Sequence, residues 1–185
     1  MTVETARLIR AANDLEEAVA STRSLKDIWR QADATFSDLI GHRLFTVLLH
    51  DAEQGDVERV YTSHPEAYPV SGRKAMGSTP WGKLVLQEGQ VFLGRDVQHI
   101  RWAFPDHAVI EGLGLGSVIN LPLRCLGRTY GTINLLHEAG FYRQEQIGVA
   151  RCLAIPLVPL GLHLASAANA NQQSGKEHAD NDNYH

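Results

Sequence analysis

Residues Phe104–Leu136 read FPDHAVIEGLGLGSVINLPLRCLGRTYGTINLL, and this stretch decides the fold. Pro105 suits the first turn of a short helix, and the glycines that follow are placed to end it. Two apolar runs come next, at 117–125 and 128–137, with Leu126-Gly127 between them. A two-residue break between apolar runs is typical of a tight antiparallel hairpin. The stretch therefore predicts a helix, a glycine turn and two paired strands.

The sequence on either side adds further elements. Two apolar stripes at helical spacing predict two helices within the first 40 residues, with Ser24 as the N-cap of the second. Strands are expected at 43–50, 57–63 and 90–94. A helix is expected from Thr79 to Gly89, and another begins near Tyr142, where Pro156 and Pro159 should kink it or end it early. The segments 64–76 and 95–103 are expected to be a loop and an irregular stretch.

This order of elements predicts an α+β fold, with an antiparallel sheet of about five to six strands flanked by helices on both faces. Residues 24–168 would form this domain. Residues 1–23 are interpreted as a dimerisation helix, because their stripe (Leu8, Ala12, Leu15, Val19, Thr22) is spare once the second helix covers the sheet. Residues 169–185 carry no apolar residue larger than alanine apart from one tyrosine and are expected to be a disordered polar tail.

Composition bounds the class of protein. The chain has 185 residues, a net charge of -4, 44% hydrophobic and 21% charged residues, as expected for one domain with a proper core. No basic excess indicates nucleic acid, and no signal peptide or run of roughly 18 apolar residues indicates a membrane. Two cysteines without a CxxC pattern suit a reducing compartment. We therefore expect a cytoplasmic protein.

The phrases GSVINLPL (116–123) and YGTINLL (130–136) resemble those of a GAF domain, and the resemblance covers roughly residues 25–165. The resemblance implies a small-molecule-binding module, which is usually dimeric and linked to another domain or protein that carries the signal. Little else accompanies the domain here, so a stand-alone sensor acting through a partner protein is expected. The family's pocket, mapped onto this chain, involves residues 64–74, Trp81, 96–107 and 113–120.

Well-known versions of the family differ from this chain at their signatures. Bilin-binding members carry a Cys-His pair before the glycine turn; His107 matches the histidine, but Asp106 replaces the cysteine, so no covalent bilin is expected there. The cyclic-nucleotide signature Asn-Lys-Phe-Asp does not occur. Free methionine sulfoxide reductases of this fold use several clustered cysteines, whereas this chain has Cys125 and Cys152 alone. The ligand therefore stays unnamed.

Candidate ligand contacts are aromatic, cationic or polar residues near the mapped pocket. Aromatic walls with a few polar groups suit a small molecule, and adjacent Arg73 and Lys74 could hold a carboxylate or phosphate. The expected ligand is therefore small and polar or anionic. The predicted contact residues are Tyr61, His64, Tyr68, Arg73, Lys74, Trp81, Asp96, Trp102, Phe104, His107, Ser117 and Asn120.

Two buried amides, Asn120 and Asn134, are expected in the paired strands. The alternation of side chains along the strands does not decide which of them faces the pocket. With the two-residue turn, Asn120 faces Ile133 and Asn134 faces Ile119, which puts the two amides on opposite faces of the sheet. Ser117 would then share a face with Asn134. A β-bulge would reverse this relationship. Asn120 is the favoured pocket residue from its place in the GSVINLPL phrase.

A second function class is an enzyme built on the same scaffold. Its catalytic residues would be His107, Asp106 and Asp96, which lie close in the sequence. A metal could assist, held by His64, Asp96, His99 and His107, since imidazole and carboxylate are ligands that zinc and iron accept. The spacing matches no standard metal motif, and no nucleophile motif occurs. The cofactor is therefore unassigned, and binding is preferred to catalysis.

Overall fold

The computed structural model describes residues 3–70 and 72–167. Its centre is one sheet of six antiparallel strands in the order β3-β2-β1-β6-β5-β4. The strands are β1 (Leu44–Asp51), β2 (Asp56–Thr62), β3 (Arg73–Ala75), β4 (Phe92–Gly94), β5 (Ser117–Cys125) and β6 (Arg128–His137). This confirms the predicted α+β class and the number of strands.

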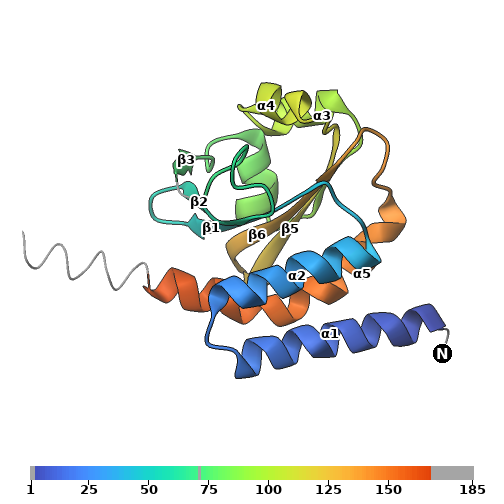
Figure 1. The fold of residues 1–185 in the computed structure, drawn as a ribbon. Helices are drawn as coiled ribbons and strands as arrows, with labels where there is room; N and C mark the ends of the chain where they lie inside the picture. Colours follow the sequence, from blue (N-terminus) through green and yellow to red (C-terminus); the bar gives the residue numbers. More distant parts are fainter. Residues whose placement is uncertain (1–2, 71, 168–185) are drawn as a thin grey trace, which may run out of the picture.

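Helices cover both faces of the sheet (Figure 1). One face carries α1 (Val3–Ser21), α2 (Leu25–Leu39) and α5 (Gln144–Ala154), followed by a 3-10 turn, η2 (Ile155–Leu157). The other face carries a π-helix, η1 (Gly82–Gln87), with α3 (Val97–Ala103) and α4 (His107–Gly112). Ser24 caps α2 as predicted, since its side chain accepts from the Asp27 N–H.

The predicted hairpin agrees with the structure in its bounds and its turn. Strands β5 and β6 have the expected limits, and Cys125 pairs with Arg128 across Leu126-Gly127. Leu126 has φ 49° and Gly127 has φ 77°, so both turn residues are left-handed, as a tight hairpin with right-twisted strands requires. Glycine adopts this backbone without steric cost, and Leu126 is the one described residue other than glycine that does so.

Two local expectations are wrong, and two are confirmed with a change of detail. Part of the loop expected at 64–76 forms β3, which pairs with β2 at the edge of the sheet. The irregular segment at 95–103 contains α3, because the Asp96 carboxylate caps that helix by accepting from the N–H groups of Gln98 and His99. The helix expected after Thr79 is present, and most of it is a π-helix. The last α-helix, which Pro156 and Pro159 were expected to kink or end early, is interrupted after Ala154 by the 3-10 turn η2, and the chain then continues as a helix to Ala167.

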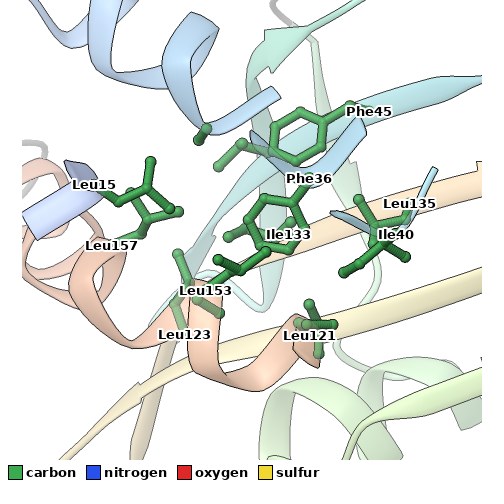
Figure 2. Close-up of a cluster of buried hydrophobic side chains, with 14 of the residues drawn as sticks. Leu15, Phe36, Ile40, Phe45, Leu121, Leu123, Ile133, Leu135, Leu153 and Leu157 are labelled. Atoms are coloured by element: carbon green, nitrogen blue, oxygen red, sulfur yellow. The ribbon is translucent and has the colours of Figure 1, made fainter. Parts of the chain in front are cut away.

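The larger core lies between the sheet and α1, α2 and α5. Figure 2 shows Leu15 of α1 beside Leu157, in the same cluster as Ile133 and Leu135 of the sheet. Leu15 and Ala18 are buried, and Leu8 and Val19 pack against the cluster. The stripe of α1 is therefore not spare, as the sequence had suggested, because most of it covers this chain's own core.

One helical stretch bears on the expectation that no segment of this chain crosses a membrane. Gln144–Ala167 meets the length and composition of a membrane-spanning helix. Its residues Ile147, Ala150, Leu153 and Leu157 are buried in the core next to the sheet. Packing therefore accounts for part of the apolar composition, and one such helix is weak evidence for a membrane span.

Two β-bulges decide which side chains face the helices and which face the opposite side. In β2, Val47 pairs with Tyr61 but Leu48 pairs with Arg59, so Val60 is an extra residue without a partner in the register. In the β5–β6 pair, the register shifts between Leu123 and Arg124 of β5, and Tyr130 of β6 is the extra residue. Each bulge reverses the facing of every residue beyond it relative to simple alternation.

Candidate ligand-binding site

A cavity of about 50 Å³ lies between the sheet and the elements that carry η1, α3 and α4. Strands β1, β2 and β6 form its floor, and the segment before β3, the start of η1 and the α3–α4 junction cover it. This volume is small beside the roughly 300–1,000 Å³ of pockets for drug-sized ligands, so it suits a small organic molecule. The lining residues are Leu44, Thr46, Leu48, Val57, Arg59, Tyr68, Gly72, Lys74, Met76, Trp81, Phe104, Asp106, Ile110, Asn134 and Leu136.

More than half of the cavity wall is apolar. Trp81 is fully buried and packs against Phe104, with ring centroids 5.9 Å apart. Leu44, Val57 and Leu136 line the floor and belong to the smaller hydrophobic core. An apolar wall of this kind lowers the local dielectric, which strengthens each polar contact made inside it. The polar groups described next therefore decide what the cavity can hold.

Asp106 ties two segments together at the border of the cavity. Its Oδ2 atom accepts a hydrogen bond from Lys74 Nζ at 2.6 Å and another from Tyr68 Oη at 2.6 Å. Burial raises the pKa of Asp106, but the bonds from Lys74 and Tyr68 outweigh it, and the net pKa lies below the ordinary value. Burial, and then the bond to Asp106, raises the pKa of Tyr68. Tyr68 therefore remains a protonated donor to an ionised carboxylate at neutral pH.

Arg59 is the second cation of the cavity. Its guanidinium carbon lies 4.3 Å from the centroid of the Tyr68 ring, and Nη1 donates to the Pro69 carbonyl at 3.0 Å. Burial lowers the pKa of Arg59, and the nearby Tyr68 and Asp106 oppose that change. Its Nε atom is buried and has no hydrogen-bond partner among the described residues. An unpaired buried donor costs about 1–3 kcal/mol of stability, so an acceptor placed beside Arg59 Nε would stabilise the site.

A chain of buried hydrogen bonds runs under the cavity. Trp81 Nε1 donates to Asn120 Oδ1 at 2.9 Å, and Asn120 Nδ2 donates to Asn134 Oδ1 at 2.7 Å. Asn134 Nδ2 then donates to Thr46 Oγ1 at 3.1 Å. All four residues are buried. These hydrogen bonds join the start of η1 to β5, β6 and β1, and every member except Asn120 lines the cavity.

The two amides face the same side of the sheet. Because of the bulge at Tyr130, Asn120 pairs with Asn134 rather than with Ile133. The arrangement without a bulge is therefore wrong, and the bulged alternative holds. Ser117 lies outside the cavity lining and donates to the Glu138 carbonyl at 2.7 Å. Asn120 itself lies behind Asn134 and is not part of the lining.

The structure brings five of the predicted site residues to the cavity: Tyr68, Lys74, Trp81, Phe104 and Asp106. Tyr61 does not join them, because the bulge at Val60 turns it to the opposite face. There its hydroxyl donates to Asp33 of α2 at 2.9 Å, and its ring packs on Phe45. Burial, and then this bond, raises the pKa of Tyr61.

Arg73 and Trp102 also lie away from the cavity. Arg73 alternates with Lys74 on β3, so it points to the other side, where it pairs with Asp51 at 3.1 Å and Asp56 at 3.3 Å. Trp102 is 47% exposed, with its ring centroid 5.2 Å from that of Phe92. The adjacent cations predicted to act together are thus separated by strand alternation.

The proposed histidine and aspartate cluster is not assembled. His99 pairs with Asp96 at 2.8 Å, next to the α3 cap, whereas His107 pairs with Glu111 one helical turn along. His64 borders a separate hollow beside Arg43 and Leu113. Within residues 3–70 and 72–167, no group of three or more such side chains is placed to hold a metal ion. The residues suggested for a metal therefore do not share a site.

Sequence reasoning missed Arg59 and Thr46 as cavity residues, and it favoured Asn120 where Asn134 lines the cavity. Simple alternation put Arg59 on one face with Tyr61, and only the bulge separates them. Thr46 was read as part of an apolar strand. A polar residue inside such a run, in a sheet covered on both faces, is the signal that could have indicated it, as it did for the two asparagines.

The comparisons with known proteins agree with this fold. A family model described as GAF domain matches residues 22–158, so the chain belongs to the GAF domain family. A comparison with curated proteins found no match.

Among solved structures, the chain resembles the GAF domains of two phosphoenolpyruvate-protein phosphotransferases. The one from Acinetobacter has a TM-score of 0.70 at 14% identity, covering 90% of this chain and 97% of that one. The one from Coxiella burnetii has a TM-score of 0.69 at 15% identity, covering 91% and 99%. Free methionine-R-sulfoxide reductase from Neisseria meningitidis has a TM-score of 0.59 at 20% identity, covering 94% and 95%. At these identities the likeness shows the fold alone.

Proposed function

We propose that this GAF domain binds a small organic anion in the cavity beneath Asp106 and acts as a sensor or binding protein. The observation that carries the proposal is the buried Arg59 Nε–H group without an acceptor. A ligand oxygen that accepted this bond would relieve its desolvation, and a charge-assisted bond of this kind is among the stronger ones.

The charges around the cavity support an anion rather than a cation. Arg59 and Lys74 contribute two positive charges, and Asp106 contributes one negative charge that Lys74 and Tyr68 already engage. The net charge of the lining is therefore positive. The apolar wall of Trp81, Phe104 and neighbouring residues would receive a short hydrocarbon part of the ligand.

The enzyme alternative gains no support from the geometry. Of the three residues it needs, only Asp106 lines the cavity, while Asp96 caps α3 and His107 pairs with Glu111. The two cysteines do not form a pair: Cys125 is partly buried at the hairpin and Cys152 is exposed on α5. Binding is thus the function for which this cavity offers suitable groups.

We further propose that the protein is a cytoplasmic homodimer that signals through a partner protein. Ile9 of α1 is 48% exposed and offers an apolar contact on the outer side of that helix. Sedimentation at several concentrations would measure the oligomeric state. A monomer at all concentrations would contradict the homodimer without affecting the ligand proposal.

Thermal unfolding in the presence of small carboxylates tests the binding function. At a ligand concentration of about 100 times Kd, stabilisation of about 2.7 kcal/mol is expected, which corresponds to several degrees in Tm. Arg59→Met should abolish the increase in Tm. Arg73→Met, whose side chain lies outside the cavity, is the matched control and should retain it. Loss of the increase in both variants would contradict a specific role for Arg59.

A further inference from the structure

We propose that the Thr46 hydroxyl is the hydrogen-bond donor that sets the specificity of the cavity. The series of hydrogen bonds through Trp81, Asn120 and Asn134 leaves the Thr46 hydroxyl proton free to donate to a ligand carboxylate. This inference rests on the proposed function and deepens it. The cavity would then recognise a carboxylate and reject the amide of the same shape. The argument starts from the direction of the buried hydrogen bonds.

Trp81 sets the direction of donation along this series of buried hydrogen bonds. An indole N–H can only donate, so the Asn120 atom that faces it must be the carbonyl oxygen. The Asn120 amide nitrogen then faces Asn134, which must present its own oxygen. The Asn134 nitrogen is left to donate to Thr46 Oγ1. Each amide orientation thus follows from the one before it.

Thr46, the last residue in this series of hydrogen bonds, keeps a hydroxyl proton that it does not donate to the described part of the protein. Thr46 Oγ1 accepts from Asn134, so its own proton must point elsewhere. No bond donated by this hydroxyl is found within the part of the chain that the structure describes. Thr46 is only 4% exposed and lines the cavity. A buried hydroxyl of this kind needs an acceptor, and the cavity is the space left for one.

A second unpaired donor lies on the same face of the sheet. Arg59 pairs with Leu48, which is two residues along β1 from Thr46, so the bulge at Val60 brings Arg59 and Thr46 to neighbouring same-face positions. Both line the cavity. Two donors, one of them charged, match the two oxygens of a carboxylate. An amide would turn its NH₂ group toward one donor and leave it unpaired, and sites built this way discriminate strongly.

Calorimetric titration with propanoate, propanamide and inorganic phosphate tests this inference on the wild type, Thr46→Val and Thr46→Ser. Valine keeps the shape of threonine without the hydroxyl, whereas serine keeps the hydroxyl. Propanoate should bind the wild type and Thr46→Ser similarly, within about threefold, and Thr46→Val about tenfold or more weakly. Propanamide should not bind measurably. Equal propanoate affinity in Thr46→Val, or phosphate binding as tight as propanoate, would overturn the assignment.

A ligand-free measurement covers the case in which Thr46→Val does not fold. Scalar coupling across hydrogen bonds in the ¹⁵N,¹³C-labelled wild type should connect Asn120 Nδ2 to Asn134 Cγ. Coupling from Asn134 Nδ2 to Asn120 Cγ would show the opposite direction and would overturn the inference without any ligand. If the expected coupling is present but the wild type binds none of the three probes or other small carboxylates, the proposed function has failed, and the ligand assignment fails with it.

Discussion

Asn120 lies directly opposite Asn134 in the β5–β6 pair, and its Nδ2 atom donates to Asn134 Oδ1 at 2.7 Å. This contact exists only because the bulge at Tyr130 shifts the register by one residue beyond the hairpin turn. It links the indole of Trp81 to the hydroxyl of Thr46 across three strands. The stability of the domain and the polarity of its cavity therefore depend on the same buried bonds.

Replacing Trp81 with Phe should destabilise the domain by about 1–3 kcal/mol, because Asn120 Oδ1 would remain buried without its donor. Urea unfolding followed by circular dichroism measures the change. The matched control is Trp102→Phe, since Trp102 is 47% exposed, and its effect should stay within about 0.5 kcal/mol. Equal effects of the two substitutions would mean that the indole bond contributes nothing.

Gly82→Ala should destabilise the domain by about 1–3 kcal/mol or more, because a Cβ atom there would lie 1.8 Å from the Met76 carbonyl oxygen. Gly148→Ala in α5 has no atom within 4 Å of its new Cβ and should stabilise by about 0.5–1 kcal/mol. Chemical unfolding of both variants checks the pair. A neutral Gly82→Ala would show that η1 can move away from the segment before it.

Leu15→Ala should cost about 2–5 kcal/mol at every protein concentration, because Leu15 is buried in the core of its own chain. Ile9→Ala should have little effect on the unfolding of the isolated chain, since Ile9 is 48% exposed. If α1 pairs with a second copy through Ile9, that variant should weaken self-association instead. Unfolding curves at a low and a high protein concentration distinguish these effects.

Asp106→Asn should loosen the cover of the cavity, because the ion pair with Lys74 is lost while Tyr68 keeps an acceptor. The pKa of Asp106 is depressed, so its stabilising contribution is complete above the ordinary carboxyl pKa and is lost as pH falls through the lower folded value. Hydrogen exchange at neutral pH should be faster in β3 and α4 and unchanged in α5. Asp38→Asn, which removes an exposed ion pair with Arg7, is the control.

Protonation of His137 should destabilise the fold. Burial, and then Arg43, lowers the pKa of His137, and its Nδ1 atom accepts from the Glu138 N–H at 2.8 Å. Since the unfolded state binds the proton more tightly, the stabilisation is fully present above about pH 6.5 and is lost as pH falls below that value. His137→Asn should reduce this slope in unfolding free energies measured from pH 5 to 7.5. An unchanged slope would assign the pH dependence to other groups.

Several features followed from the sequence alone. The limits of β5 and β6, the Leu126-Gly127 turn and the Ser24 cap depend on residues close in the chain, and all were predicted. The cap of α3 by Asp96 is equally local, but it was overlooked because Asp96 had been interpreted as a ligand residue. Five cavity residues were predicted because the family resemblance pointed to the segments that carry them.

What only the tertiary structure decided is the direction in which side chains point. Alternation along β2 placed Arg59 and Tyr61 together, and alternation through the hairpin separated Asn120 from Asn134; one bulge in each strand pair reversed both relationships. A bulge has no dependable local signal, because it is selected by how both faces of the sheet pack at once. The sequence by itself thus determined the elements and their order, whereas packing across the sheet determined which residues line the cavity.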